Sequence, residues 1–288
     1  MQDVVIVAAT RTPIGSFHGA LAPLSAVELG TAVVRSLLEK TAVAPEQIDE
    51  VILGQVLTTG CGQNPARQTA LRAGLPVTTP ALTINLVCGS GLKAVHQAVQ
   101  AIRCGDAQIV IAGGQESMSN APYFLDGARA GLRLGHASMK DSVVHDGLWD
   151  AFNDYHMGVT AENLAREYGI SREQQDAWAL SSQHKARRAI DSGRFRDEIV
   201  PVVNLQPGGS YIVDTDEQPQ TDASAEALAR LVPSFDQAGS VTAGNASSIN
   251  DGAAAVLMMS ESKALELGLP ILARIRAFAS FVVAPALI

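Results

Sequence analysis

In the first 118 residues, short apolar runs alternate with stretches whose apolar positions recur at helical spacing. Residues 25–42 show this helical spacing, and further helices are predicted from Asn64-Pro65 to Gly74 and over about 89–104. Buried strands are predicted at 4–8, 50–57, 81–87 and 107–112. This alternation predicts an α/β fold with a mixed, mostly parallel sheet that carries helices on both faces.

The pattern changes at Gly113-Gly114, and up to about Ser248 the chain is more polar and irregular. The clearest feature of this stretch is one amphipathic helical segment over 160–192. A strand at 252–259, a helix at 260–267 and a strand at 271–280 then resume the first pattern. We therefore predict a layered domain interrupted by an inserted loop domain, with segments 1–118, 119–248, 249–270 and 271–288.

Composition and charge narrow the class of protein. The chain is 47% hydrophobic and 17% charged, as is usual for a globular protein with a large core. A net charge of -8 and the lack of any Lys/Arg run argue against a nucleic-acid partner. No signal-peptide pattern opens the sequence, and no apolar stretch reaches the ~20 residues that a membrane span needs. Three cysteines without a disulfide framework or metal-ligand spacing predict reduced thiols, a cytoplasmic location and no metal site.

Cys88 is the candidate nucleophile, because it follows a predicted strand and precedes Gly89-Ser90-Gly91 and a predicted helix. The N–H groups and the dipole at a helix N-terminus favour a thiolate, and the small residues leave room for a substrate carbonyl. A strand–nucleophile–helix turn of this kind suits acyl transfer. The alternative is that Cys88 is a small buried apolar residue, and spacing alone does not separate the two. For Cys61, in a Gly-rich loop, and Cys104, at a helix C-terminus, the structural role is favoured.

Six blocks decide between these alternatives by resemblance. They are VIVAATRTPIG (5–15), GQNPARQ (62–68), NLVCGSG (85–91), AGGQESMS (112–119), HMG (156–158) and TAGNAS (242–247). In this order they resemble the thiolase family, most closely its biosynthetic, acetoacetyl-CoA type. The resemblance implies a thiolase-like layered fold and a Claisen condensation of two acetyl-CoA through an acyl-Cys88 intermediate, or thiolysis in reverse. CoA thioesters are then substrates, and no other cofactor is expected.

The same resemblance implies that the inserted domain binds CoA. His156 and Met157 would line the pantetheine end, Leu148, Phe235 and Ala243 would line the channel, and Ser247 would contact the pantetheine chain. For Leu148 and Phe235, simple core packing is an equally good interpretation. The family also implies a homo-oligomer, either a dimer or a tetramer, without fixing which.

The chain departs from the family pattern in its second half. Three family blocks do not occur in it: an Asn-Glu-Ala-Phe-like block, a Gly-His-Pro block with the activating His, and a Cys-x-Gly-Gly block with a proton-transferring Cys. With the apolar ending of 281–288, this suggests a truncated thiolase that lacks most of the second half, with 271–288 as that half's first strand. Gln220, where the family often has Arg, and Ser248, where it has Gly, point to weaker CoA binding.

Two other interpretations remain open. One is a catalytically inactive, truncated fragment that acts as a CoA-binding or assembly module, which the absent base and second Cys favour. The other is a ketoacyl-synthase-like Claisen enzyme, against which the His156-Met157-Gly158 block speaks. The sequence fixes neither the acyl chain length nor the physiological direction.

Overall fold

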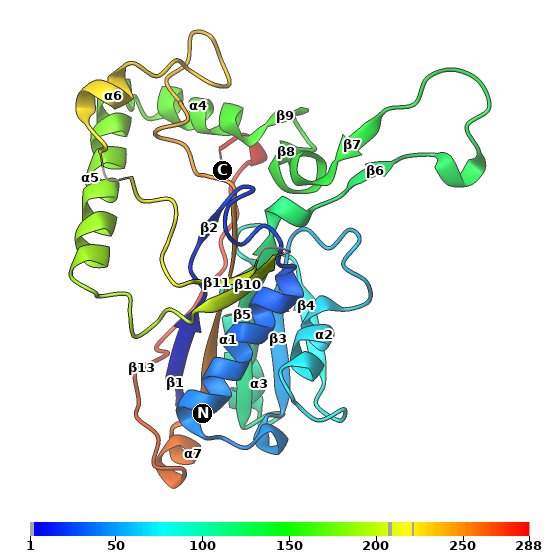
Figure 1. Ribbon diagram of the computed structural model, residues 1–288, viewed down its shortest axis with the longest axis vertical. Helices are drawn as coiled ribbons and strands as arrows, with labels where there is room; N and C mark the ends of the chain where they lie inside the picture. The colour runs from blue at the N-terminus through cyan, green and yellow to red at the C-terminus, as the bar shows by residue number, and fades with distance from the viewer. Residues whose placement is uncertain (1–2, 207–208, 221, 288) are drawn as a thin grey trace. The chain divides into compact units, whose positions relative to one another are not determined.

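A computed structural model describes residues 3–206, 209–220 and 222–287, so the ends of the predicted segments 1–118 and 271–288 lie outside the described residues (Figure 1). The chain divides into two compact units. The first contains residues 1–121, 197–216 and 250–279, and the second contains 122–196, 217–249 and 280–288. Residues 197–216, which we assigned to the insert, therefore belong to the first unit.

The first unit is built on a seven-stranded sheet with the order β13-β1-β12-β5-β3-β4, in which β2 also pairs with β12. The predicted α/β class is confirmed, but the prediction of a mostly parallel sheet is wrong. Among the described residues, β12 pairs antiparallel with β1, β2 and β5, and β1 with β13, whereas only β3–β4 and β3–β5 are parallel. The strands are β1 Val4–Arg11, β2 Gly15–Ser16, β3 Glu50–Gly54, β4 Ala81–Ile84, β5 Ile109–Ser117, β12 Asn250–Ser260 and β13 Ala273–Arg274.

The error has a simple cause. The strand–helix–strand pattern in the sequence reports only on chain neighbours, and the neighbours β3, β4 and β5 do run parallel. The strand β12 comes from beyond the insert and enters between β1 and β5, against the direction of both. The strand predicted at 271–280 is also shorter than expected, because only Ala273–Arg274 pairs with β1.

Helices cover both faces of this sheet, as predicted. On one face, α1 (Ala26–Thr41) and α2 (Pro65–Arg72) bury their apolar residues against one set of strand side chains. On the other face, α3 (Ser90–Cys104) buries Ala94, Ala98, Val99 and Ile102 against the alternate side chains of the same strands. In Figure 1, α1 lies in front of the sheet and α3 behind it. A short helix, α7 (Glu261–Glu266), follows β12.

Residues 197–216 are tied to the first unit by ion pairs of Arg11 at the end of β1. The Arg11 guanidinium lies 2.7 Å from a Glu198 carboxylate oxygen and 2.7 Å from one of Asp216. Between these two acids runs the hairpin of β10 (Val202–Gln206) and β11 (Gly209–Val213). Burial of Val202 and Val213 in the core beside α1 explains why this stretch leaves the polar insert.

The regular elements of the second unit are chiefly helices, joined by long irregular segments. The single helix predicted over 160–192 is two helices, α4 (Met157–Glu167) and α5 (Arg172–Asp191), because Gly169 takes a positive φ of 62° and Ser171 caps α5. Figure 1 shows β6 and β7 as the stem of a long hairpin. The remaining elements are β6 Tyr123–Leu125, β7 Met139–Asp141, β8 Trp149–Asp150, β9 Tyr155–His156, α6 Ala225–Ala229, the π-helix Val143–Leu148 and the 3-10 helices Pro45–Gln47, Met118–Asn120, Ala128–Ala130 and Pro285–Leu287.

Candidate active site

Cys88 lies in a tight turn of the first unit, between the end of β4 and the start of α3, and is an exposed free thiol. The preceding residue, Val87, has a φ of 48°, a conformation that is strained for a β-branched side chain. Ser90, at the start of α3, holds this turn from inside. Its Oγ accepts the Leu86 N–H at 2.8 Å and donates to the Val87 carbonyl at 2.6 Å. Sequence patterns singled out Cys88 but not Ser90, although it stands in the same block.

The start of α3 lies directly on the sheet because glycines remove the side chains between them. A Cβ on Gly54, the last residue of β3, would lie 2.5 Å from the Ser90 carbonyl carbon and 2.6 Å from the Gly91 nitrogen. Such distances do not occur between real atoms, so any side chain at Gly54 must displace the first turn of α3. The position of Cys88 therefore depends on β3 as well as on its own turn.

Glu116 of β5 supports the loop that follows β3. Its carboxylate accepts the Val56 N–H at 2.7 Å and the Leu57 N–H at 3.1 Å. Burial raises the pKa of Glu116, although these two hydrogen bonds act in the opposite direction. Cys61 lies in the same loop, where the Gln55 amide donates to its sulfur at 3.3 Å and burial raises the pKa of the thiol. The AGGQESMS block thus has a structural role in the loop next to the turn of Cys88.

The other predicted site residues lie in the second unit. His156 caps α4, and its Nδ1 accepts the Gly158 N–H at 3.0 Å. The Phe235 ring stacks on the His156 ring, with centroids 4.8 Å apart and planes inclined by 19°. A Cβ on Gly158 would lie 2.2 Å from the Phe235 ring, so the glycine of the HMG block leaves the space that the Phe235 ring occupies. The structure therefore brings Phe235 onto His156, the residue before Met157 in the chain.

The remaining predicted residues belong to the same unit. Leu148 ends the π-helix just before β8, which pairs with β9 so that Trp149 stands opposite His156. Ala243 and Ser247 are exposed and belong to the loop of the TAGNAS block. Gln220 lies elsewhere, with its N–H donating to the Gln183 side chain of α5 at 2.9 Å.

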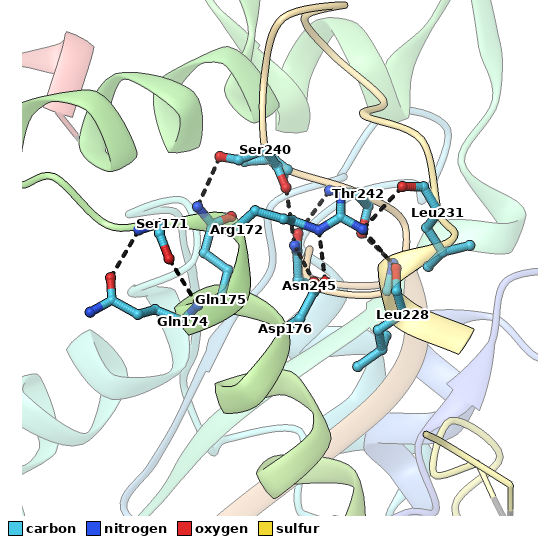
Figure 2. A network of polar contacts seen from close by, with 12 residues as sticks. Ser171, Arg172, Gln174, Gln175, Asp176, Leu228, Leu231, Ser240, Thr242 and Asn245 are labelled. Carbon is cyan, nitrogen blue, oxygen red and sulfur yellow. Dashed lines mark hydrogen bonds and ion pairs between the residues drawn. The ribbon is translucent and has the colours of Figure 1, made fainter. Parts of the chain in front are cut away.

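The TAGNAS loop owes its shape to Asn245. Its Oδ1 accepts the Thr242 N–H at 2.8 Å, and its Nδ2 donates to Asp176 at 2.9 Å and to the Ser240 carbonyl at 3.1 Å. Figure 2 shows Asn245 between Asp176 of α5 and the loop backbone. Asn245 is thus the residue that fixes the block, and sequence reasoning assigned it no role.

His156 makes the unfolding free energy depend on pH. Only the neutral imidazole accepts at Nδ1, and burial lowers the pKa of His156 from its usual value near 6.5. As pH falls through about 6.5, His156 becomes protonated in the unfolded chain but stays neutral in the folded chain. The stability that His156 contributes is therefore complete above about pH 6.5 and lost as pH falls towards the lower, folded-state pKa.

Urea unfolding of the wild type and of His156→Asn between pH 8 and 5 measures this contribution. Asn is also a good N-cap residue but does not titrate in this range. We expect the wild type to lose unfolding free energy relative to His156→Asn as pH falls. Parallel curves for the two proteins contradict the assignment.

The part of the chain that the structure describes contains neither a candidate metal site nor a candidate membrane-spanning helix. No group of three or more His, Cys, Asp or Glu side chains there could hold a metal ion. None of the helices described is long and apolar enough to cross a membrane.

The chain is similar to known proteins over nearly its whole length. Residues 4–262 match the family model described as "Thiolase, N-terminal domain". A "Probable acetyl-CoA acetyltransferase" of Escherichia coli K12 is 71% identical over 287 residues, which make up 100% of this chain and 73% of that protein. An "Acetyl-CoA acetyltransferase" of Pseudomonas aeruginosa is 65% identical over 288 residues, again 100% of this chain and 73% of the relative. The crystal structure of the Bacillus anthracis acetyl-CoA acetyltransferase superposes with a TM-score of 0.93 at 45% identity, over 95% of this chain and 69% of that one.

Proposed function

This chain belongs to the thiolase family, and we propose on that basis that it is an acetyl-CoA acetyltransferase. The proposed reaction condenses two acetyl-CoA to acetoacetyl-CoA, or runs as thiolysis in the reverse direction. The names of the relatives support the substrate class. The observation that carries the proposal is Cys88 itself, an exposed thiol that Ser90 holds in a strained turn immediately before a long helix.

In the proposed mechanism, the Cys88 thiolate attacks the carbonyl carbon of an acetyl-CoA thioester. A bond forms between that carbon and Cys88 Sγ, and the CoA thiolate leaves; over the whole cycle it gains the proton that the methyl carbon of the second acetyl-CoA loses. A second acetyl-CoA, deprotonated at its methyl carbon, then attacks the acetyl-Cys88 carbonyl and releases the Cys88 thiolate. The Cys88 backbone N–H would help to stabilise the oxyanion in these steps.

CoA binding is proposed for the second unit. The pantetheine chain would contact Ser247 and the stacked pair of His156 and Phe235, with Met157, Leu148 and Ala243 lining its path. Because Nδ1 of His156 is taken by the Gly158 N–H, the Nε2–H is the group that His156 offers to a ligand. The biosynthetic type, a cytoplasmic location and a homo-oligomeric state are further proposals.

The test is to incubate the purified chain with excess acetyl-CoA while following intact mass, free CoA and acetoacetyl-CoA. An acetyl adduct with acetoacetyl-CoA formation supports the enzyme. An adduct without turnover supports the alternative of a catalytically inactive module that binds CoA or assembles with other chains. The proposal fails if neither an adduct nor a product forms.

A further inference from the structure

Residues 234–247 of the second unit carry three of the proposed CoA-lining residues, Phe235, Ala243 and Ser247. Two buried carboxylates from different helices hold the backbone of this segment: Glu162 of α4 is 2% exposed and Asp176 of α5 is 9% exposed. The mechanism above uses neither. Burial of a charged group is costly unless hydrogen bonds compensate it, so the bonds of these carboxylates indicate their role.

The Glu162 carboxylate forms its hydrogen bonds with one short piece of the chain. It accepts the Ser240 N–H at 2.9 Å, the Val241 N–H at 2.7 Å and the Ser240 hydroxyl at 3.1 Å. A Cβ on Gly239 would lie 2.2 Å from Glu162 Oε1, so a glycine is required for the carboxylate to reach the chain. The fit is therefore specific to a carboxylate at this position.

Asp176 holds the other end of the same segment. Its Oδ1 accepts from Asn245 Nδ2 at 2.9 Å, and its Oδ2 accepts from Arg172 Nε at 2.7 Å. Arg172 also donates to the carbonyls of Leu228 and Leu231, whose side chains surround Gly244. Figure 2 shows this chain of contacts, and it also shows Gln175 donating to the Ser240 hydroxyl.

We propose that Glu162 and Asp176 are positioning residues that clamp segment 234–247 in its CoA-binding shape. Glu162 stands on the helix that His156 caps and Met157 begins, so its bonds to Ser240 and Val241 set Phe235 and Ser247 relative to those two residues. This inference rests on the proposed function, and it adds two residues that do not touch CoA themselves. A segment held in advance loses less conformational freedom on binding.

The experiment compares Glu162→Gln with Glu167→Gln, the same change at an exposed position of the same helix. Asp176→Asn is compared with Asp191→Asn, which alters an exposed Arg–Asp pair of the same i,i+4 spacing on α5. CoA binding to the full chain is measured by calorimetry, and the alkylation rate of Cys88 by iodoacetamide is measured in parallel. We expect Kd to rise about tenfold in Glu162→Gln and Asp176→Asn, as loss of a hydrogen bond to a charged group implies.

The stoichiometry separates positioning from a merely structural role. Positioning raises Kd while the number of sites and the Cys88 alkylation rate stay at wild-type values. A structural defect instead lowers the number of sites at an unchanged Kd, and that result overturns the inference, as does a Kd equal to that of the paired control. If the wild type binds no CoA, the proposed function and the inference both fail. If the wild type binds CoA and each variant has the Kd of its paired control, the inference alone fails.

Discussion

A Cys88→Ala chain gains no acetyl group from acetyl-CoA, whereas Cys61→Ala and Cys104→Ala chains are acetylated as the wild type is. The three thiols differ in their surroundings. Cys61 is half-buried, and burial raises the pKa of its thiol, so little thiolate forms near neutral pH. Cys104 is exposed but is the last residue of α3, at the end of the helix dipole that disfavours an anion. Cys88 is exposed and stands just before the first turn of the same helix.

Intact mass and peptide mapping after incubation with acetyl-CoA measure this selectivity. Cys104→Ala is the matched control, because it removes an exposed thiol at the opposite end of the same helix. We expect at least a 100-fold lower yield in Cys88→Ala, as removal of a nucleophile from its activated setting implies. An adduct that persists in Cys88→Ala, or that maps to Cys61, would refute the assignment of the nucleophile.

Local signals predicted much of the first unit correctly. The apolar spacing of 25–42 predicted α1, the Asn64-Pro65 start and Gly74 stop predicted α2, and the block around Cys88 predicted the strand–turn–helix that holds it. Each of these features is set by residues close in sequence, through caps, proline, glycine and helical periodicity. The same locality explains the errors. Nothing near β12 indicates that it enters between β1 and β5, and nothing near Val202 indicates that it rejoins the first core.

The site shows the same division. The sequence blocks NLVCGSG, HMG and TAGNAS pointed to Cys88, His156 and Ser247, because each of these residues stands in a recognisable segment. They did not point to Glu162 or Asp176, which are single acidic residues on amphipathic helices and look like solvent-exposed side chains in the sequence. Their burial follows from pairing with backbone groups of Ser240 and with Asn245, 78 and 69 residues away along the chain. Interactions at that separation leave no local pattern.

A Ser90→Ala chain is acetylated at Cys88 about 100-fold more slowly than the wild type, the cost that a misplacement of about 1 Å imposes on a reacting group. Ser90 is 4% exposed, and its hydroxyl bonds both the Leu86 N–H and the Val87 carbonyl. Without it the Leu86 N–H loses its partner, while the Val87 carbonyl keeps the backbone N–H of residue 90 as a donor. The turn then holds Val87 less firmly at its φ of 48°. Alanine is a good helix former, so α3 itself remains intact and the change is confined to the turn. The unfolding free energy falls by about 1–3 kcal/mol, as expected for the loss of two hydrogen bonds.

Ser25→Ala supplies a control of similar chemistry, because Ser25 caps α1 in the same unit through a capping box with Glu28. Loss of that cap costs about 1 kcal/mol, yet it leaves the turn of Cys88 untouched. Acetylation and iodoacetamide alkylation of Cys88 are measured for both variants, together with urea unfolding. If Ser90→Ala loses stability but reacts at the rate of Ser25→Ala, the hydroxyl of Ser90 stabilises the fold without setting the position of the nucleophile. A slower reaction in Ser90→Ala alone shows that the strained turn, and the hydroxyl that maintains it, hold Cys88 in its reactive position.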